Sequence, residues 1–475
     1  MAETPFLGTA YTSRSKDLAD QRCINLYPEM VETKTGAAVG AFFGTPGLTL
    51  KATAGNGPVR GMKTVNGVLY VVSGTGVYSV SPTFNVSQLG TIATGSGQVS
   101  IISNGTQLAI FDGIAGYCLT ISTGVVSTIS LPFPNPGTAV YQDGFGLVNQ
   151  LNSQLFWQSN LFDFTTWNAL SYAQESATAS NIAALGELHR QVYVFKQDGA
   201  FVYVNDGLPG FAFQRLDGVS LDVGTIAPNS VSKCGESLLW LGQNEQGQGV
   251  VYEASGYQPQ RRSTHAIEHT LAGYPTLSDA IAYSYQQEGH YFYQLSFPAG
   301  NETWVLDLTA TRMMGVPAWH QRAAFSNGQF SRHQTATQAF FAGYTIVGDI
   351  QSGNLYSYDL DNYTDNGATR KWLRSWRARD KTTERAARIN WLEIQAETGV
   401  KPTTNFNPQM VLRQSYDSYS WSPEIFSAVG TVGNTGQRIK FNRLGTERRG
   451  LGTDRIFELS STDAFKVALL SAKIG

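Results

Sequence analysis

Residues 59–80 read VRGMKTVNGVLYVVSGTGVYSV, where an apolar, β-branched or aromatic stretch is followed by a Gly-containing turn and then by a second such stretch. The same pattern returns along the chain, with copies that begin at Val99, Ala139, Asn181, Asn229, Asp279 and Ala323. Successive copies begin roughly 40 to 50 residues apart, a period typical of β-propeller blades with about four short strands each.

The repeat predicts an all-β fold built on a β-propeller. Seven copies favour seven blades, and six is the alternative because the copy from Ala139 is degenerate. In a propeller each small sheet buries both faces against its neighbours, and closing the ring leaves only short strand edges exposed. A pair of β-sandwiches would not explain the regular spacing.

The segments on either side of the repeats differ from them. Residues 1–57 are punctuated by Pro and Gly without a clear period, and we expect an extended N-terminal arm there. Residues 58–367 are the predicted β-propeller, and residues 368–475 are predicted to form a basic C-terminal β domain resembling a β-sandwich. From residue 368 onward there are 18 Lys and Arg against 10 Asp and Glu, which leaves 16 and 26 in the rest of the chain.

Composition excludes several classes of protein. Charged residues make up 15% of the 475 residues, below the roughly 25% that is usual. The three cysteines, Cys23, Cys118 and Cys234, are too few and too far apart for a disulfide scaffold or a zinc knuckle. The N-terminus lacks the apolar core of a signal peptide, and no stretch approaches the ~20 apolar residues that cross a bilayer. We therefore expect synthesis in a reducing cytoplasm and release by lysis.

Two short motifs resemble metal sites. HAIEH, at residues 265–269, matches the H-x-x-E-H pattern of inverted zinc peptidases, in which the two histidines share one helix face and Glu268 is a possible base. We favour a short connecting helix with two solvated histidines, because the motif lacks its downstream acidic ligand. DLDNYTDNG, at residues 359–367, has acidic spacing but lacks the fifth-position oxygen ligand and sixth-position glycine of a calcium loop. We interpret it as a polar turn and expect no metal and no cofactor.

RQSYDSYSWSPE, at residues 413–424, resembles the S-x-D-x-G-x-x-W turn of sialidases. Ser415 and Asp417 match, but Tyr419 replaces the glycine and Trp421 comes one residue early. A glycosidase also needs two carboxylates roughly 5–10 Å apart, and a sialidase needs clustered arginines for the substrate carboxylate. The repeats are poor in arginine and the turn lies outside them. We interpret it as a hairpin whose Ser or Asp caps the turn, and we predict that the protein is not an enzyme.

Basic residues of the last segment form a candidate docking surface. Its members are Arg370, Lys371, Arg374, Arg377, Arg379, Arg438, Lys440, Arg443, Arg448 and Arg449. Trp372 and Trp376 are interleaved with them and could stack on bases. Such a surface binds either an acidic protein neighbour or phosphate, and we favour the protein neighbour because the rest of the chain is acidic.

Stretches spread along the whole chain resemble the tail-hub or nozzle proteins of short-tailed bacteriophages, the packaged-DNA stabilisation family. They are ADQRCINLYPE (19–29), FFGTPGLTL (42–50), RGMKTVNGVLYVVSGTGVYSV (60–80), STHAIEHTL (263–271), GHYFYQLSFPAGNETWVLDL (289–308), GDIQSGNLYSYDLDNYTDNG (348–367), SYDSYSW (415–421) and GQRIKFNRLGTERRG (436–450). Their order, more than any single motif, makes the resemblance specific. In that family HAIEH falls in a non-catalytic segment.

The resemblance implies structural work in a virion tail. Such hubs form a hexameric ring beneath the portal and its adaptor, retain the packaged DNA until ejection, and seat the tail needle and tailspikes or fibres. The implied partners are further copies of the chain, these proteins and the double-stranded DNA in the channel, without a small-molecule substrate. Ring symmetry needs only one type of head-to-tail interface, and low charge with abundant Tyr and Phe suits permanent interfaces.

Two alternatives belong to other functional classes. A sialidase-like propeller glycosidase would have clustered carboxylates at the propeller axis and would turn over a glycan. A lectin-like glycan-binding tail protein would have near-identical pockets between blades, which the divergence of the repeats disfavours.

Overall fold

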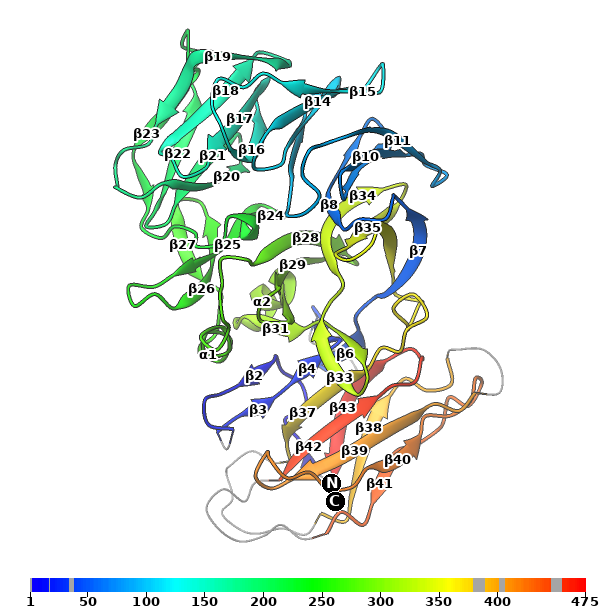
Figure 1. The fold of residues 1–475 in the computed structure, drawn as a ribbon. Helices are drawn as coiled ribbons and strands as arrows, with labels where there is room; N and C mark the ends of the chain where they lie inside the picture. The colour runs from blue at the N-terminus through cyan, green and yellow to red at the C-terminus, as the bar shows by residue number, and fades with distance from the viewer. Residues whose placement is uncertain (1, 17, 34–37, 379–388, 401–405, 446–454) are drawn as a thin grey trace.

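The computed structural model describes residues 2–16, 18–33, 38–378, 389–400, 406–445 and 455–475. Strands dominate, and the described helical elements are α1 (His265–Leu271), α2 (Leu308–Met314) and the 3-10 turn η1 (Pro228–Ser230). No helix among the described residues has the length and apolar character needed to cross a bilayer. Small sheets fill one end of the molecule and a second group of strands, in orange and red, fills the other (Figure 1).

Seven four-stranded units follow one another along the chain, each a set of antiparallel neighbours. Blades 1 to 4 are β8 (Val59–Val65), β9 (Val68–Ser73), β10 (Gly76–Val80) and β11 (Val86–Thr91); β12 (Ser100–Ser103), β13 (Gln107–Phe111), β14 (Gly116–Thr120) and β15 (Val125–Ile129); β16 (Pro136–Gln142), β17 (Phe145–Gln150), β18 (Leu155–Asn160) and β19 (Asp163–Gln174); and β20 (Ile182–Leu188), β21 (Gln191–Lys196), β22 (Ala200–Asn205) and β23 (Phe213–Leu221). Blades 5 to 7 are β24 (Ser232–Cys234), β25 (Ser237–Gln243), β26 (Gly249–Ser255) and β27 (Gln258–Arg261); β28 (Ile281–Gln287), β29 (His290–Phe297), β30 (Glu302–Asp307) and β31 (Ala318–Gln321); and β34 (Thr335–Phe341), β35 (Tyr344–Asp349), β36 (Asn354–Asp359) and β7 (Gly47–Thr53).

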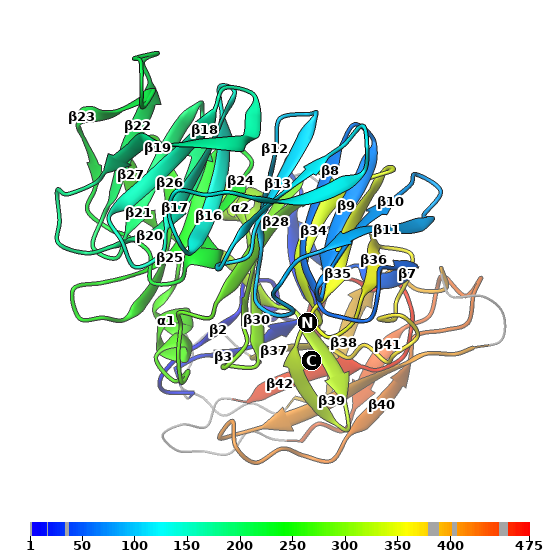
Figure 2. The same ribbon diagram turned by 45° about the horizontal axis from the view of Figure 1, so that its top comes forward.

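The seven units form a closed ring. The first strand of each blade contacts the first strand of the next, in the order β8, β12, β16, β20, β24, β28 and β34, and β34 then contacts β8. Figure 2 shows the blades side by side. The predicted β-propeller is confirmed with seven blades in the described residues, and the degenerate third repeat forms a full four-stranded sheet.

The seventh blade differs from its prediction in two ways. Its inner strand begins at Thr335 rather than at Ala323, because residues 323–332 form a separate hairpin of β32 (Ala323–Ser326) and β33 (Gln329–Arg332). Its outer strand is β7, which comes from the N-terminal part of the chain and pairs antiparallel with β36. Strands more than 300 residues apart in sequence therefore close the ring.

Tight turns between the first two strands of a blade follow from local sequence. In blade 1 the turn residues Asn66 and Gly67 have φ of 50° and 76°, as a two-residue type I′ hairpin requires. Blade 4 makes the same turn without glycine, at His189 and Arg190 with φ of 51° and 62°. The Arg190 guanidinium pairs with Asp143 of blade 3 at 2.8 Å, which helps to hold this less favourable backbone in place.

The second group of strands forms two sheets that enclose an apolar core, which confirms the predicted β-sandwich-like part of the fold. The strands are β37 (Trp372–Arg377), β38 (Trp391–Ala396), β39 (Gln409–Ser415), β40 (Ile425–Ala428), β41 (Ile439–Asn442), β42 (Ile456–Ser461) and β43 (Ala468–Ile474), with β1 (Ala2–Glu3), β4 (Cys23–Ile24), β5 (Leu26–Met30) and β6 (Gly40–Gly44) from the N-terminal segment. One sheet has the order β41-β38-β43-β6-β5, with β1 also on β43. The other sheet continues directly from blade 6, in the order β31-β4-β37-β42-β39-β40.

The N-terminal segment is shared between the propeller and the sandwich. Strand β4 pairs with β31 of blade 6 on one side and with β37 on the other, and a short hairpin of β2 (Tyr11–Thr12) and β3 (Asp20–Gln21) precedes it. The expected arm over residues 1–57 and the boundaries at residues 57 and 367 stay predictions. The observed pairing carries the N-terminal strands β1 and β4 to β7 into sheets of both parts.

Candidate docking surfaces

Arg374 of the predicted basic surface lies in the interior. Its side chain is 0% exposed on β37, and its Nε and Nη2 donate to the carbonyl oxygen of Phe6 at 3.1 and 2.9 Å. The guanidinium also lies 4.8 Å from the ring centroid of Phe42. Burial lowers the pKa of Arg374 to about 10. Arg374 fastens the N-terminal segment to the sandwich, so its assignment to a docking surface was wrong.

Arg370 is also buried, which corrects its assignment to the same surface. Its Nη1 donates to the carbonyl oxygen of Thr45, and burial lowers its pKa to about 10. Asp365 lies nearby, and burial raises the pKa of this carboxyl group despite the opposing charges of Arg370 and Arg322. Arg322 donates to the Pro46 carbonyl at 2.6 Å. Arg370 ties the chain before β7 to the segment that follows β36, and Arg322 ties it to the end of β31.

The remaining basic residues of the predicted surface differ in their surroundings. Lys371 lies 5.4 Å from the Phe325 ring and Lys440 lies 4.5 Å from the Trp391 ring. Arg438 is exposed and forms two hydrogen bonds with Glu393, at 2.8 and 2.5 Å. The other positions are Arg377, which donates to the Lys16 carbonyl, Arg443, which is exposed, and Arg379, Arg448 and Arg449, which lie outside the described residues. A docking surface made by the non-buried members stays a prediction.

The sialidase-like turn caps a hairpin, as the sequence predicted. The Asp417 carboxylate accepts hydrogen bonds from the backbone amides of Ser420 and Tyr419 at 2.6 and 2.9 Å, and these bonds lower its pKa. Trp421 lies 5.6 Å from the Arg22 guanidinium and 5.3 Å from that of Arg413.

Arg22 and Arg413 both pair with the buried carboxylate of Glu458 on β42. Since Arg22 belongs to the N-terminal segment, this turn helps to hold that segment on the sandwich.

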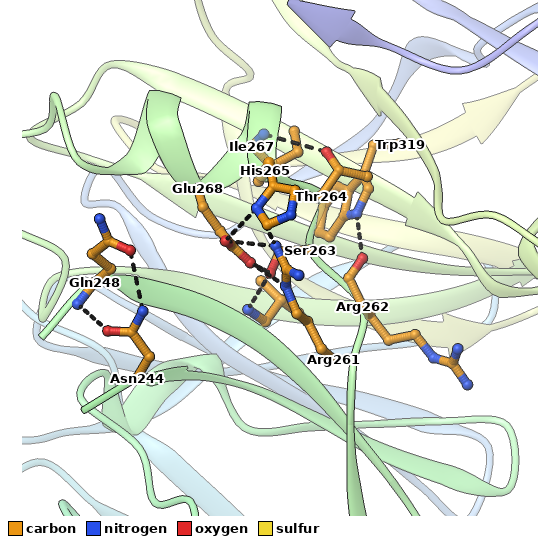
Figure 3. Close-up of polar contacts among 11 residues, drawn as sticks. Asn244, Gln248, Arg261, Arg262, Ser263, Thr264, His265, Ile267, Glu268 and Trp319 are labelled. Carbon is orange, nitrogen blue, oxygen red and sulfur yellow. Dashed lines mark hydrogen bonds and ion pairs between the residues drawn. The ribbon is translucent and has the colours of Figure 1, made fainter. Parts of the chain in front are cut away.

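HAIEH forms the first part of helix α1. Figure 3 shows the contacts of His265 and Glu268 with Arg261 and Ser263. The Glu268 carboxylate accepts from Arg261 at 2.6 and 2.7 Å and from the Ser263 hydroxyl at 2.6 Å. A guanidinium can only donate, so the Arg261 contact at 2.9 Å makes Nδ1 of His265 an acceptor. Both histidines point to solvent, whereas Ile267 and Leu271 are buried. Glu268 is thus committed to an ion pair and is not positioned as a base.

The acidic turn at residues 359–367 likewise makes internal contacts. The Asn362 amide donates to the Leu48 carbonyl at 2.9 Å, and Asp359 accepts from the backbone amide of Asp361 at 2.9 Å. In the part of the chain that the structure describes, no group of three or more His, Cys, Asp or Glu side chains is placed to hold a metal ion.

The axis of the propeller contains a cavity of about 270 Å³. Inner strands of six blades contribute to it, and at blade 5 the η1 turn and Val231 take that place. The lining residues include Arg60, Ser100, Thr138, Tyr283 and Gln338. The Arg60 guanidinium donates to backbone carbonyls at 2.5 to 2.9 Å and is thereby held in the wall. The described lining residues carry no carboxyl group, so the acid pair that glycoside hydrolysis needs is not found at this place.

A further candidate surface was not predicted from the sequence. It lies on blades 1 to 3, where large apolar side chains are exposed, among them Ile114, Phe162 and Leu170. The signal was present in the sequence, because residues 64–174 contain no Lys, Arg, His or Glu. Charge totals for residues 368–475 and for the rest of the chain do not reveal this stretch, because they average it with the charged blades that follow.

A family model described as "Bacteriophage P22 Gp10, beta-propeller" matches residues 2–363 of this chain. The match therefore includes the N-terminal strands and all seven blades, and ends before β37. No curated protein matches the sequence.

Solved structures with similar folds are distant. A streptogramin B lyase is 10% identical with a TM-score of 0.43, and the alignment covers 68% of this chain and 100% of the lyase. The Pan2 WD40 domain of Neurospora crassa is 10% identical with a TM-score of 0.41, covering 66% and 95% of the two chains. The N-terminal domain of Nup159 is 10% identical with a TM-score of 0.40, covering 72% and 99%. Likenesses at this level carry no argument about activity.

Proposed function

The chain belongs to the bacteriophage P22 Gp10 β-propeller family of packaged-DNA stabilisation proteins, and from that membership we propose that it is the tail hub of a short-tailed phage. In this role, six copies form a ring below the portal and its adaptor, close the DNA exit channel, and anchor the needle and tailspikes or fibres until ejection. The protein is made in the host cytoplasm and ends in the virion tail.

The observation that carries this proposal is the way the family-matched part is joined to the sandwich. A hub must keep its shape against the pressure of packaged DNA, and here the connection consists of paired strands rather than a flexible linker. Strand β4 is hydrogen-bonded to blade 6 and to β37, β5 and β6 belong to the sandwich sheet, and β7 closes the propeller. Two parts tied in this way behave as one body, because bending at their junction would break backbone hydrogen bonds.

We further propose that the protein performs no covalent chemistry. The motifs that suggested chemistry hold structural contacts, since Glu268 pairs with Arg261 and Asp417 caps its own turn. The non-buried basic residues of the sandwich, such as Lys440 and Arg443, would then contact an acidic protein neighbour or the phosphates of DNA in the channel.

The proposal is tested with phage particles assembled without this chain. We expect DNA-filled heads that lose their genome, measured as nuclease-accessible DNA, and tails that lack the needle and spikes. Complementation with the full chain should restore both, and mass spectrometry should detect the chain in purified particles. Stable infectious particles assembled without it would contradict the proposal, as would turnover of a sialoside or polysaccharide by the purified protein.

A further inference from the structure

Blades 1 to 3 are almost free of charge. Apart from the inner strand β8, they fall in the stretch from Thr64 to Gln174, which has three charged side chains, Asp112, Asp143 and Asp163. Each carboxylate accepts hydrogen bonds within the molecule: Asp112 from the Ile114 and Ala115 amides and the Thr94 hydroxyl, Asp143 from Arg190, and Asp163 from Gln107 and Thr165. This surface therefore offers an approaching protein almost no unpaired charge.

The outer strands of these blades also lack the usual protection of a sheet edge. Free edges are commonly blunted by charged side chains, and the outer strands of blades 4, 5 and 7 have Arg215, Arg261 and Lys51. In contrast, β11 and β15 contain no charged residue, and β19 contains none after Asp163. In the described part of the chain no further strand pairs with these three edges.

Large apolar side chains are exposed on the same blades. They are Ile114 (63% exposed), Val125 (58%), Leu161 (54%), Phe162 (62%), Leu170 (81%) and Tyr172 (42%). Depletion of charge together with exposed aromatic and aliphatic groups is typical of the buried centre of a protein interface. Figure 1 shows β15 and β19 at the end of the molecule far from the sandwich, so this surface is separate from the basic one.

Ile114 and Phe162 lie at opposite ends of their sheets. Ile114 is in the turn between the second and third strands of blade 2, and Phe162 is in the turn between the third and fourth strands of blade 3. In an up-and-down sheet these two kinds of turn lie at opposite strand ends, and hence on opposite faces of the propeller.

Both turns are held by hydrogen bonds. The Ile114 amide is held by Asp112 at 3.0 Å. Phe162 has a φ of 56°, which is rare for an aromatic residue, and its amide and carbonyl bond to Gly144 and Asn104 at 2.8 and 2.9 Å. Strained backbone that is held in this way often marks a functional position.

We infer that blades 1 to 3 form the head-to-tail contact between copies of this chain, with the Ile114 turn of one copy facing the Phe162 turn of the next. The inference rests on the proposed ring and assigns its interface. A charge buried against this surface would find no counter-charge, so the partner surface must also be neutral. Within this chain that requirement is met by blades 1 to 3 themselves, and two different faces permit a ring rather than a closed dimer.

The test uses two full-length variants, Ile114→Asp and Phe162→Asp, with Val432→Asp as the control. Val432 is an exposed aliphatic residue on the sandwich, so the control introduces the same charge elsewhere. At exposed positions none of the three should change the melting temperature appreciably. Native mass spectrometry should show that each of the first two variants is monomeric at concentrations where the wild type and the control assemble, with the dissociation constant raised by roughly tenfold or more.

An equimolar mixture of the two variants gives the sharper result. Each variant keeps one intact face, so the mixture should form heterodimers that cannot extend further. A mixture that remains monomeric would overturn the head-to-tail assignment, and variants that assemble like the wild type would overturn the interface while leaving the hub proposal intact. A wild-type chain that never assembles and is missing from particles would instead overturn the proposed function and this inference together.

Discussion

At the scale of single residues, the sequence predicted a surface position for two arginines that the structure buries. Arg374 and Arg370 are buried and bind backbone carbonyls of the N-terminal segment. A guanidinium has five donors in a fixed plane and can therefore satisfy several buried carbonyl groups at once. From a linear sequence such an arginine looks the same as one on a surface, because the groups that it binds are more than 300 residues away.

Replacement of Arg374 tests this structural role. In Arg374→Met the carbonyl oxygen of Phe6 loses its two donors, and a buried acceptor without a partner costs about 2 kcal/mol. We expect a lower denaturant midpoint and faster proteolysis within the first 25 residues. Arg438→Met is the control, since Arg438 pairs with Glu393 at the surface and exposed ion pairs contribute little. Equal effects of the two substitutions would contradict the role given to Arg374.

The buried ring of His320 should make the folding stability of the protein depend on pH. Burial lowers its pKa to about 3, and neither ring nitrogen has a hydrogen-bond partner. The unfolded chain therefore takes up a proton near pH 6.5 while the folded chain does not, so stability is lost as pH falls below 6.5, by about 1.4 kcal/mol per pH unit.

His320→Phe should remove this contribution. Tyr27 and Phe292 surround the ring, and an apolar ring of similar shape fits such a site. Melting temperatures measured between pH 7 and pH 5 should fall less steeply than in the wild type, with no loss at pH 7. An unchanged slope in His320→Phe would show that this histidine does not titrate as described.

At the scale of elements, the decisive feature is pairing between strands that are distant in sequence. Strand β7 completes blade 7, and β4 joins blade 6 to the sandwich. After β7 the chain makes a close approach to the turn before β36, where the Ala54 amide donates to the Gly353 carbonyl at 2.7 Å. A Cβ on Gly353 would overlap the backbone oxygen atoms of Ala54 and Gly55.

Gly353→Ala should therefore weaken the closure of the ring. We expect a cost of about 1–3 kcal/mol from this overlap, read as a lower melting temperature and as faster hydrogen exchange in β7 and β36. Gly436→Ala is a matched control, since the added methyl group meets nothing within 4 Å and the backbone is not left-handed. If exchange in β7 and β36 is equally slow in both variants, the closure does not depend on this approach.

The blades could be predicted from the sequence because each is a local unit. The strands and turns of one blade, such as the Asn66-Gly67 turn of blade 1, lie within about 40 to 50 residues of one another. The places of β4 to β7 could not be predicted in this way, since their partners come from the far end of the chain and short strands lack a distinctive periodicity. The hairpin of Phe325 and Phe330 was taken for part of blade 7 for the same reason.

The same distinction between local and distant contacts explains which site features could be predicted. The capping of the turn by Asp417 and the solvated histidines of α1 are local features and were predicted correctly. The burial of Arg370 and Arg374 depends on tertiary contacts and was missed.

At the scale of the whole molecule, the two ends have different surfaces. Blades 1 to 3 are nearly uncharged and partly apolar, whereas the described sandwich surface includes Lys440, Arg443 and Lys466. Paired strands join these ends into one body. A neutral end suits permanent contacts among copies, and a charged end suits partners that are recruited by electrostatic attraction. This polarity is what we expect of a subunit that first closes a ring and then binds different neighbours above and below it.

The most direct measurement of the central claim is the mass and shape of the purified wild-type chain at micromolar concentration, from native mass spectrometry and negative-stain images of the same sample. The account predicts a closed ring of six copies with a central opening, which also binds a portal–adaptor complex. A chain that stays monomeric at every concentration, alone and with the portal–adaptor complex, would contradict it.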